Sequence, residues 1–256
     1  MPTKKSLGQH WLKDRHILAH IAEPAEISSE DTVLEIGPGL GTLTSELLRR
    51  AKKVIVVEFD QDLARKLPAQ FPGKNLEVIH QDILEFNLSD MPKDYIVVAN
   101  VPYYITSKIV HMLLTAANKP KRIVLLVQKE VAERLAAQPG DMSILAVSAQ
   151  AYADVSLGHI VPAAYFTPPP KVDSQVVILD VQPSRIIGDE KQFFRIVKAG
   201  FSAKRKKLRS SIAAGLHISL AEAEALLEAA AIDPHHRAEA LSIDDWNRLN
   251  AAWTAQ

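Results

Sequence analysis

The stretch Thr32-Val-Leu-Glu-Ile-Gly-Pro-Gly-Leu-Gly-Thr-Leu-Thr44 decides the fold expected for this chain. Its first five residues form an apolar run typical of a strand buried on both faces, and a glycine-rich turn then opens a helical pattern. Glycine lets the backbone turn sharply and approach a ligand closely, and the start of a helix leaves backbone N–H groups unpaired. The stretch therefore predicts a strand, a ligand-binding turn and a helix.

The spacing of the glycines separates three interpretations of this turn. A dinucleotide-binding loop spaces its glycines Gly-x-Gly-x-x-Gly, whereas Gly37, Gly39 and Gly41 follow the order Gly-x-Gly-x-Gly and come after an acid, Glu35. This pattern resembles the loop of class I methyltransferases, which bind a nucleoside that lacks a pyrophosphate. The resemblance implies S-adenosyl-L-methionine as the cofactor, with these three glycines at its site. A purely structural turn is the alternative.

The first two-thirds of the chain alternate short apolar runs with helical patterns, which predicts an α/β fold with a parallel sheet between helices. The expected strands cover residues 32–36, 54–57, 76–79, 95–99 and 123–127, and the expected helices cover 43–51, 61–70 and 107–117. Three prolines in 166–171 exclude a central strand or helix there, and a late strand is expected at 175–181. After Pro183 the pattern is helical, so the predicted domains are 1–182 and a small all-helical domain, 183–256.

Two acids follow the second and third expected strands. Glu58 ends the second strand, where its carboxylate can accept hydrogen bonds from both hydroxyls of a ribose. Asp82 ends the third, where it can accept a hydrogen bond from the amino group of an adenine. Ligands of open α/β sheets gather at these carboxyl ends. Each acid alone could equally be a solvated residue, but three neighbouring strand ends with suitable chemistry favour a nucleoside site.

The tetrad Asn100-Val-Pro-Tyr103 follows the fourth expected strand. An exocyclic amine on a base is a poor nucleophile because its lone pair is delocalised into the ring. The Asn100 side-chain carbonyl and the backbone carbonyl of Val101 or Pro102 can accept from the amine and redirect that lone pair, while Tyr103 stacks on the base, worth about 1–3 kcal/mol. An ordinary turn is the alternative. The adjacent Tyr104 either adds to the stacking surface or packs, and we expect packing.

The charge of the chain is segregated although 30 basic and 30 acidic residues give a formal net charge of zero. Residues 185–209 hold nine basic residues and two acids, and the run Lys204, Arg205, Lys206, Lys207 and Arg209 is its densest part. A polyanion responds to such local fields and not to the net charge. We therefore expect this run to contact RNA phosphates; the alternative is a solvated helical face.

Several further motifs make the chain resemble one family, the ribosomal RNA adenine dimethyltransferases, and within it the small-subunit member. The matching stretches are Lys5–Gln9 with Leu12, Glu35–Gly41, Glu58–Asp60, Asn100–Tyr104, Phe166–Ser174, Phe201–Arg209 and Arg237–Ser242. The resemblance implies a class I, Rossmann-like methyltransferase domain with a mostly parallel seven-stranded sheet. It also implies a helical rRNA-docking domain and, as substrate, two adjacent adenosines near the 3′ end of small-subunit rRNA in an immature subunit, each of which receives two methyl groups.

The N-terminal motif departs from the family, because His10-Trp11 stands where Asn-Phe is usual. The resemblance implies that His10 and Leu12 contact the cofactor, and a neutral imidazole still offers one donor and one acceptor; a surface histidine is the alternative. The stretch 139–143 is also several residues shorter than in the family. Two other functions stay open: dimethylation of large-subunit rRNA, of the macrolide-resistance type, and a non-catalytic role in ribosome assembly.

Composition excludes several other classes of protein. The chain has no cysteine, which excludes disulfides, zinc–thiolate sites and thiol nucleophiles. No histidine spacing indicates a metal site, and no metal is expected. The first eleven residues carry charge with no apolar run behind them, and no apolar stretch approaches the roughly 20 residues that span a bilayer. We expect a soluble, cytoplasmic monomer with no membrane contact.

Overall fold

The computed structural model describes residues 10–203 and 205–255. Contacts between Cα atoms divide the chain into two compact units. Unit 1 comprises Met1–Glu133 with Ala153–Gln182, and unit 2 comprises Arg134–Tyr152 with Pro183–Gln256. The boundary expected at residue 182 coincides with one junction of this division, and the segment 134–152 is an addition to the second unit.

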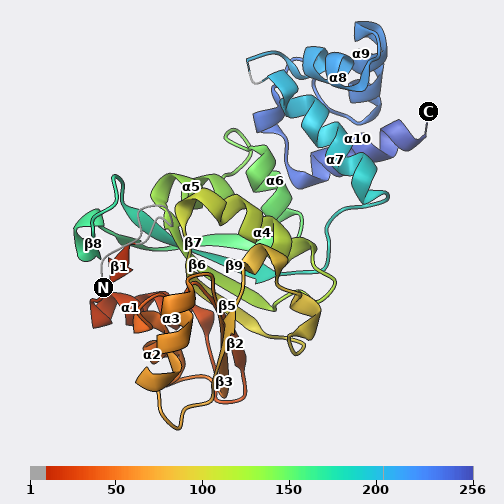
Figure 1. Ribbon diagram of the computed structural model, residues 1–256. Helices are drawn as coiled ribbons and strands as arrows, with labels where there is room; N and C mark the ends of the chain where they lie inside the picture. The colour runs from red at the N-terminus through yellow and green to blue at the C-terminus, as the bar shows by residue number, and fades with distance from the viewer. Residues whose placement is uncertain (1–9, 204, 256) are drawn as a thin grey trace. The chain divides into compact units, whose positions relative to one another are not determined.

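Unit 1 is built around a seven-stranded sheet, as expected (Figure 1). The strand order is β4-β3-β2-β5-β6-β9-β7. These strands are β2 (Thr32–Ile36), β3 (Lys53–Glu58), β4 (Leu76–His80), β5 (Ile96–Asn100), β6 (Arg122–Gln128), β7 (Ala153–Val161) and β9 (Ser174–Val181). The pairs among β4, β3, β2, β5 and β6 are parallel, while β9 pairs antiparallel with both β6 and β7.

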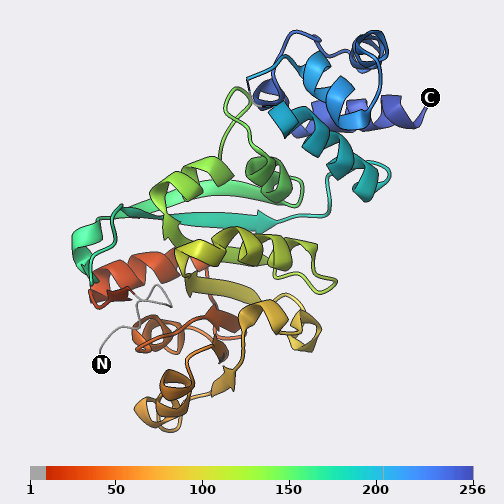
Figure 2. The ribbon, with the colours of Figure 1, turned by 45° about the horizontal axis from the view of Figure 1, so that its top comes forward.

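Helices cover the sheet because its central strands are apolar on both faces. Val33 and Leu34, which point to opposite faces, are both fully buried, and the same holds for Val97 and Val98. One face packs against side chains of α1 and α2, among them Leu18 and Leu47. The helices of this unit are α1 (Arg15–Ala22), α2 (Thr42–Leu47), α3 (Gln61–Lys66), α4 (Thr106–Thr115) and the first residues of α5 (Lys129–Leu135). Figure 2 shows this helical layer and the strands from a second side.

The order of the strands reverses between β2 and β5. The chain runs outward from β2 through β3 to β4, then returns so that Val33–Glu35 of β2 pair with Ile96–Val98 of β5. Loops that leave two such strands at their carboxyl ends diverge and leave a crevice, which is where open α/β sheets bind ligands. The glycine turn and the tetrad are the two segments that leave these strands.

Unit 2 is helical, with α6 (Ile144–Gln150), α7 (Glu190–Gly200), α8 (Leu208–Leu216), α9 (Leu220–Ala229) and α10 (Ile243–Thr254). Its core joins the segment 134–152 to the C-terminal helices, because Met142 and Val147 belong to the same apolar cluster as Phe193 and Trp246. Backbone bonds from Gly140 N and Met142 N to the Glu239 carbonyl fix the segment further. In the part of the chain that the structure describes, no helix is long and apolar enough to cross a bilayer.

Candidate active site

A cavity of about 190 Å³ lies at the carboxyl ends of β2, β3, β4 and β5, entirely within unit 1. It brings together most residues that the sequence nominates. All four members of the tetrad line it, as do the expected cofactor residues His10, Leu12, Gly37, Gly39, Glu58 and Asp82. Gly41 is the exception and does not line the cavity.

The glycine turn is shaped by close packing as well as by backbone conformation. Gly39 has a φ of +57°, and a Cβ there would lie 2.5 Å from the Trp11 ring. Gly41 has a φ of +77°, and a Cβ there would lie 2.6 Å from the Leu67 side chain. Gly39 therefore lets Trp11 lie over the turn, whereas Gly41 serves the packing of α2 against its own unit. The cofactor contact expected at Gly41 stays a prediction.

Glu58 is a buried anchor of the turn. Its Oε2 accepts from Gly39 N at 3.1 Å, and its Oε1 accepts from Asp60 N at 2.8 Å. Burial raises the pKa of Glu58, and the two backbone N–H donors act in the opposite direction. A carboxylate that is held by the backbone at a strand end can still accept from a ligand hydroxyl, since each oxygen has two lone pairs.

Glu35 lines the same cavity and, like Glu58, is buried. It is fully buried in β2, and the Thr44 hydroxyl donates to its Oε2 at 2.6 Å. Burial raises the pKa of Glu35 to about 8, and the nearby Glu58 adds to the increase. At neutral pH the carboxyl of Glu35 is therefore protonated, and the cavity avoids two adjacent buried negative charges.

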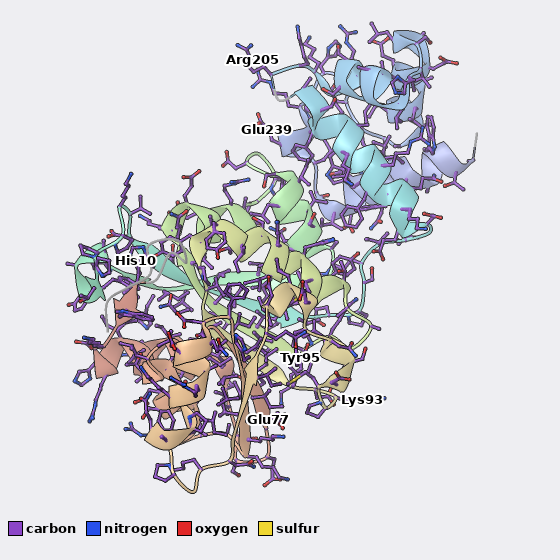
Figure 3. All side chains as sticks on the ribbon, viewed as in Figure 1. His10, Glu77, Lys93, Tyr95, Arg205 and Glu239 are labelled. Atoms are coloured by element: carbon purple, nitrogen blue, oxygen red, sulfur yellow. The ribbon has the colours of Figure 1, made fainter. Side chains whose placement is uncertain are left out.

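The N-terminal residues close one side of the cavity. Leu12 is buried, and its carbonyl accepts from the Thr42 hydroxyl at 2.8 Å. The short strand β1 (Trp11–Leu12) pairs antiparallel with β8 (Phe166–Thr167), so the proline-rich segment holds the N-terminal segment against α2. His10, labelled in Figure 3, places Nδ1 2.7 Å from the Pro168 carbonyl. Because a carbonyl only accepts, Nδ1 carries the hydrogen.

The tetrad is positioned by the end of β5 and by the turn that follows it. The Pro102 carbonyl accepts from Ile105 N at 3.2 Å and from the Thr106 hydroxyl at 3.5 Å, which favours the Val101 carbonyl as the backbone acceptor for a ligand. The Tyr103 hydroxyl lies 2.7 Å from the hydroxyl of the fully buried Ser174, and its ring stacks against His10 with centroids 6.0 Å apart. Burial raises the pKa of Tyr103, so its hydroxyl stays neutral.

The lining of the cavity fits the nucleoside cofactor. Phe59 is 59% exposed and Leu84 is 36% exposed, and these apolar side chains follow Glu58 and Asp82, where a flat base would cover them. Asp82 Oδ1 accepts a hydrogen bond from Leu84 N at 2.9 Å, so Oδ2 is the oxygen that can accept from a ligand. Trp11 Nε1 is buried without a hydrogen-bond partner among the described residues. A ligand acceptor would satisfy that donor, whose isolation is otherwise costly.

The residues of the basic run differ in their surroundings. Arg205, Lys206 and Lys207 are exposed in the turn that precedes α8, so they do not form a helical face, and Arg205 extends away from its unit (Figure 3). Arg209 differs, because its guanidinium forms a close ion pair with Glu224 within unit 2. The phosphate contact expected at Arg209 stays a prediction, and its guanidinium already has this internal partner. Lys204 lies outside the described residues.

Sequence reasoning missed other features of the site. It did not find the contact of Ser174 with Tyr103, because the two residues are 71 positions apart and meet only when β9 pairs with β6. It also expected Tyr104 to pack, and this is wrong: the Tyr104 side chain is 66% exposed at the rim of the cavity.

The fold and the cavity define an S-adenosylmethionine-dependent methyltransferase of class I. The family described as ribosomal RNA adenine dimethylase matches residues 2–254 of the chain. The chain belongs to this family, which confirms the expected enzyme class and its methyl donor.

Relatives support the assignment over nearly the whole chain. The ribosomal RNA small subunit methyltransferase A of Dehalococcoides mccartyi strain CBDB1 is 43% identical, over 97% of this chain and 88% of its own length. The protein of the same name from Clostridium botulinum strain Okra is 42% identical, over 96% of this chain and 92% of its own.

Two solved structures are similar to this one. A dimethyladenosine transferase from Plasmodium falciparum has a TM-score of 0.81 and 31% identity, covering 94% of this chain and 96% of that one. The 23S rRNA methyltransferase ErmE has a TM-score of 0.77 and 29% identity, covering 94% and 98%. The expected class I fold is therefore confirmed.

The state of Glu35 predicts a pH dependence of stability. Its pKa in the folded protein, about 8, lies above its ordinary value of 4.5, so the folded protein binds more protons than the unfolded chain between these values. The contribution of this proton to the free energy of unfolding is largest below pH 4.5. It decreases as the pH rises toward 8, by at most about 1.4 kcal/mol per pH unit. Glu35→Gln should flatten the pH dependence measured by urea unfolding. Glu77→Gln, on the exposed side of β4, is the control and should leave it unchanged; a wild-type slope in Glu35→Gln would contradict the assignment.

The position of Glu58 predicts its role in cofactor binding. Glu58→Ala should weaken the binding of S-adenosylhomocysteine, measured by calorimetry, more than it slows methyl transfer at saturation. The reason is that the ribose hydroxyls do not change during the reaction. Glu77→Ala, which removes an exposed ion pair with Lys53 on the neighbouring strand, is the matched control. An unchanged dissociation constant in Glu58→Ala would remove this residue from the cofactor site.

Proposed function

We propose that this protein dimethylates two adjacent adenosines in a hairpin near the 3′ end of small-subunit rRNA, acting as a cytoplasmic monomer on an immature small subunit. The observation that carries the proposal is the meeting of the tetrad and the cofactor-type lining in one cavity. The curated relatives at 42–43% identity are named for the small subunit, whereas the large-subunit enzyme is 29% identical. A complete set of acceptors at Glu58, Asp82 and Asn100 argues against a non-catalytic assembly factor.

The proposed cofactor site uses the residues that follow β2, β3 and β4. Glu58 would hold the ribose hydroxyls, Asp82 the adenine amino group, and His10, Leu12, Gly37 and Gly39 would surround the remainder. When bound, S-adenosylmethionine supplies an electrophilic methyl group on its sulfonium. Because its pKa is raised to about 8, Glu35 adds little negative charge to the cavity at neutral pH.

The tetrad activates the target amine by accepting hydrogen bonds from it. The Asn100 side-chain oxygen and the Val101 carbonyl both accept from the target amine, which localises the nitrogen lone pair outside the ring plane. Because the Pro102 carbonyl is engaged by Ile105, the second acceptor is assigned to Val101. Preorganised acceptors of this kind cost no reorganisation during the reaction.

Tyr103 orients the base against these acceptors. Its hydroxyl is fixed by Ser174 and one ring face is stacked by His10, so the plane of the ring is set before the substrate arrives. The ring then presents its other face to the adenine. Asn100 binds the amine at the edge and Tyr103 holds the plane, and together they define the direction in which the nitrogen lone pair points.

The catalytic role of Asn100 is tested by Asn100→Ala. Transfer to undermethylated small subunits should fall on the order of 10²–10³-fold, while affinity for S-adenosylhomocysteine stays nearly unchanged. Asn75→Ala provides the control, because Asn75 bonds the Lys52 carbonyl away from the cavity. Mass spectrometry of the rRNA measures the dimethyladenosines. Near-wild-type methylation by Asn100→Ala would exclude the tetrad as the catalytic element.

The RNA-anchoring role of the turn before α8 is tested by replacing Arg205, Lys206 and Lys207 together with Ala. Binding to undermethylated subunits should weaken, and the log–log salt slope should fall by about 0.7–0.9 for each lost phosphate contact. The matched control replaces three exposed cations of α7, Lys191, Arg195 and Lys198, and changes the net charge equally. Equal salt slopes in the two triple variants would contradict the anchoring role. Cofactor affinity should stay constant in each variant.

A further inference from the structure

A second aromatic ring at the rim of the cavity has no part in the chemistry described so far. Tyr104 follows Tyr103 directly in the 3-10 turn Tyr103–Ile105, and both residues line the cavity. Their surroundings differ. Tyr103 is fixed by Ser174 and His10, whereas Tyr104 is 66% exposed and forms no hydrogen bond or ring contact with the described residues.

The position of Tyr104 separates it from the other exposed apolar side chains at the rim. Phe59 directly follows Glu58 after β3, and Leu84 lies two residues beyond Asp82 after β4; these acids are assigned to the nucleoside part of the cofactor. Tyr104 follows β5 instead, directly after the residues assigned to the target base. It is therefore continuous with the substrate side of the cavity and not with the cofactor side.

We propose that Tyr104 is the stacking platform for the nucleobase next to the one that is being methylated. This inference rests on the proposed function, because its occupant is the second of two adjacent adenosines. Two consecutive tyrosines, one held inward and one exposed at the rim, match two consecutive bases, one inserted and one outside. Stacking on an exposed ring needs only the π face of the base, so this contact requires no hydrogen-bond donors.

A nearby cation supports an RNA strand at this rim. Lys108 lies four residues further on, in the first turn of α4, and is exposed. It forms no ion pair with any residue that the structure describes. An exposed ammonium group on the helix that follows the Tyr104 turn offers a contact for a backbone phosphate, as in other sites for single-stranded nucleic acid.

The platform would give one cavity access to two substrates. While one adenosine is held by the tetrad, the neighbouring base is kept unstacked from its own strand and close to the mouth. Exchange of the two bases then needs no release of the RNA. Loss of Tyr104 should consequently affect only substrates that possess a neighbouring base.

The experiment is a double-mutant cycle between the protein and the RNA. Undermethylated small subunits are prepared with either the natural adenosine pair or an abasic nucleotide in place of one adenosine. One adenosine is present in both substrates. The rate constant kcat/KM for methylation of this adenosine is measured for wild-type protein, Tyr104→Phe and Tyr104→Ala. Tyr165→Ala is the matched control, because Tyr165 is 49% exposed in the same unit but does not line the cavity.

On the natural pair, Tyr104→Ala should lower kcat/KM about tenfold, while Tyr104→Phe and Tyr165→Ala stay near wild type. On the abasic subunits, Tyr104→Ala and wild type should be equal. An equal loss on both substrates would place Tyr104 against the target base or in the fold and would overturn the platform, as would no loss on either. Failure of wild-type protein to methylate the natural pair would instead refute the proposed function, so the two failures are distinguishable.

Discussion

The parallel pairing of β2 with β5 is the constraint on which the site depends. Val33–Glu35 lie beside Ile96–Val98, although some sixty residues of chain and two further strands separate them. This pairing reverses the order of the sheet, and the segments that leave the two strands therefore diverge at one edge. The glycine turn brings the residues assigned to the methyl donor to that edge, and the tetrad brings those assigned to the acceptor. Neither segment alone would define a reaction.

Buried acids stabilise this arrangement in two different ways. Glu58 receives backbone hydrogen bonds from Gly39 and Asp60, so its oxygens shape the turn that they also offer to a ligand. Glu35 receives one bond from Thr44 in a fully buried environment and becomes neutral through burial. Two backbone donors favour the charged form of a carboxyl and oppose the effect of burial at Glu58, whereas Glu35 has one hydroxyl donor against full burial.

The fold could be predicted from the sequence where the local pattern of residues agrees with the global fold. The central strands could be predicted because they are apolar on both faces. The candidate site could be proposed because Glu58 and Asn100 end two of the sheet's strands and Asp82 comes two residues after another. The strand β7 was not placed individually, since an edge strand such as Ala153–Val161 mixes polar and apolar residues and contains a bulge near Gly158. The segment around α6 joined unit 2 through Met142 and Val147, which no local signal reveals.

Side-chain partners were the least predictable level, because they depend on contacts between distant segments. Arg209 belongs to a dense basic run in the sequence, yet it forms an ion pair with Glu224 on the next helix, whereas Arg205, Lys206 and Lys207 are exposed in the turn before α8. The location of the basic turn in unit 2 and of the cavity in unit 1 suits the proposed reaction. Two dimethylated adenosines require four methyl transfers, and therefore four exchanges of cofactor. Cofactor exchange requires a cavity that releases its ligand, whereas repeated transfer to one RNA requires retention of the substrate. With the proposed phosphate contacts in unit 2 and the proposed cofactor cavity in unit 1, the two affinities can differ, because salt-dependent anchoring of the RNA adds nothing to the binding of the cofactor.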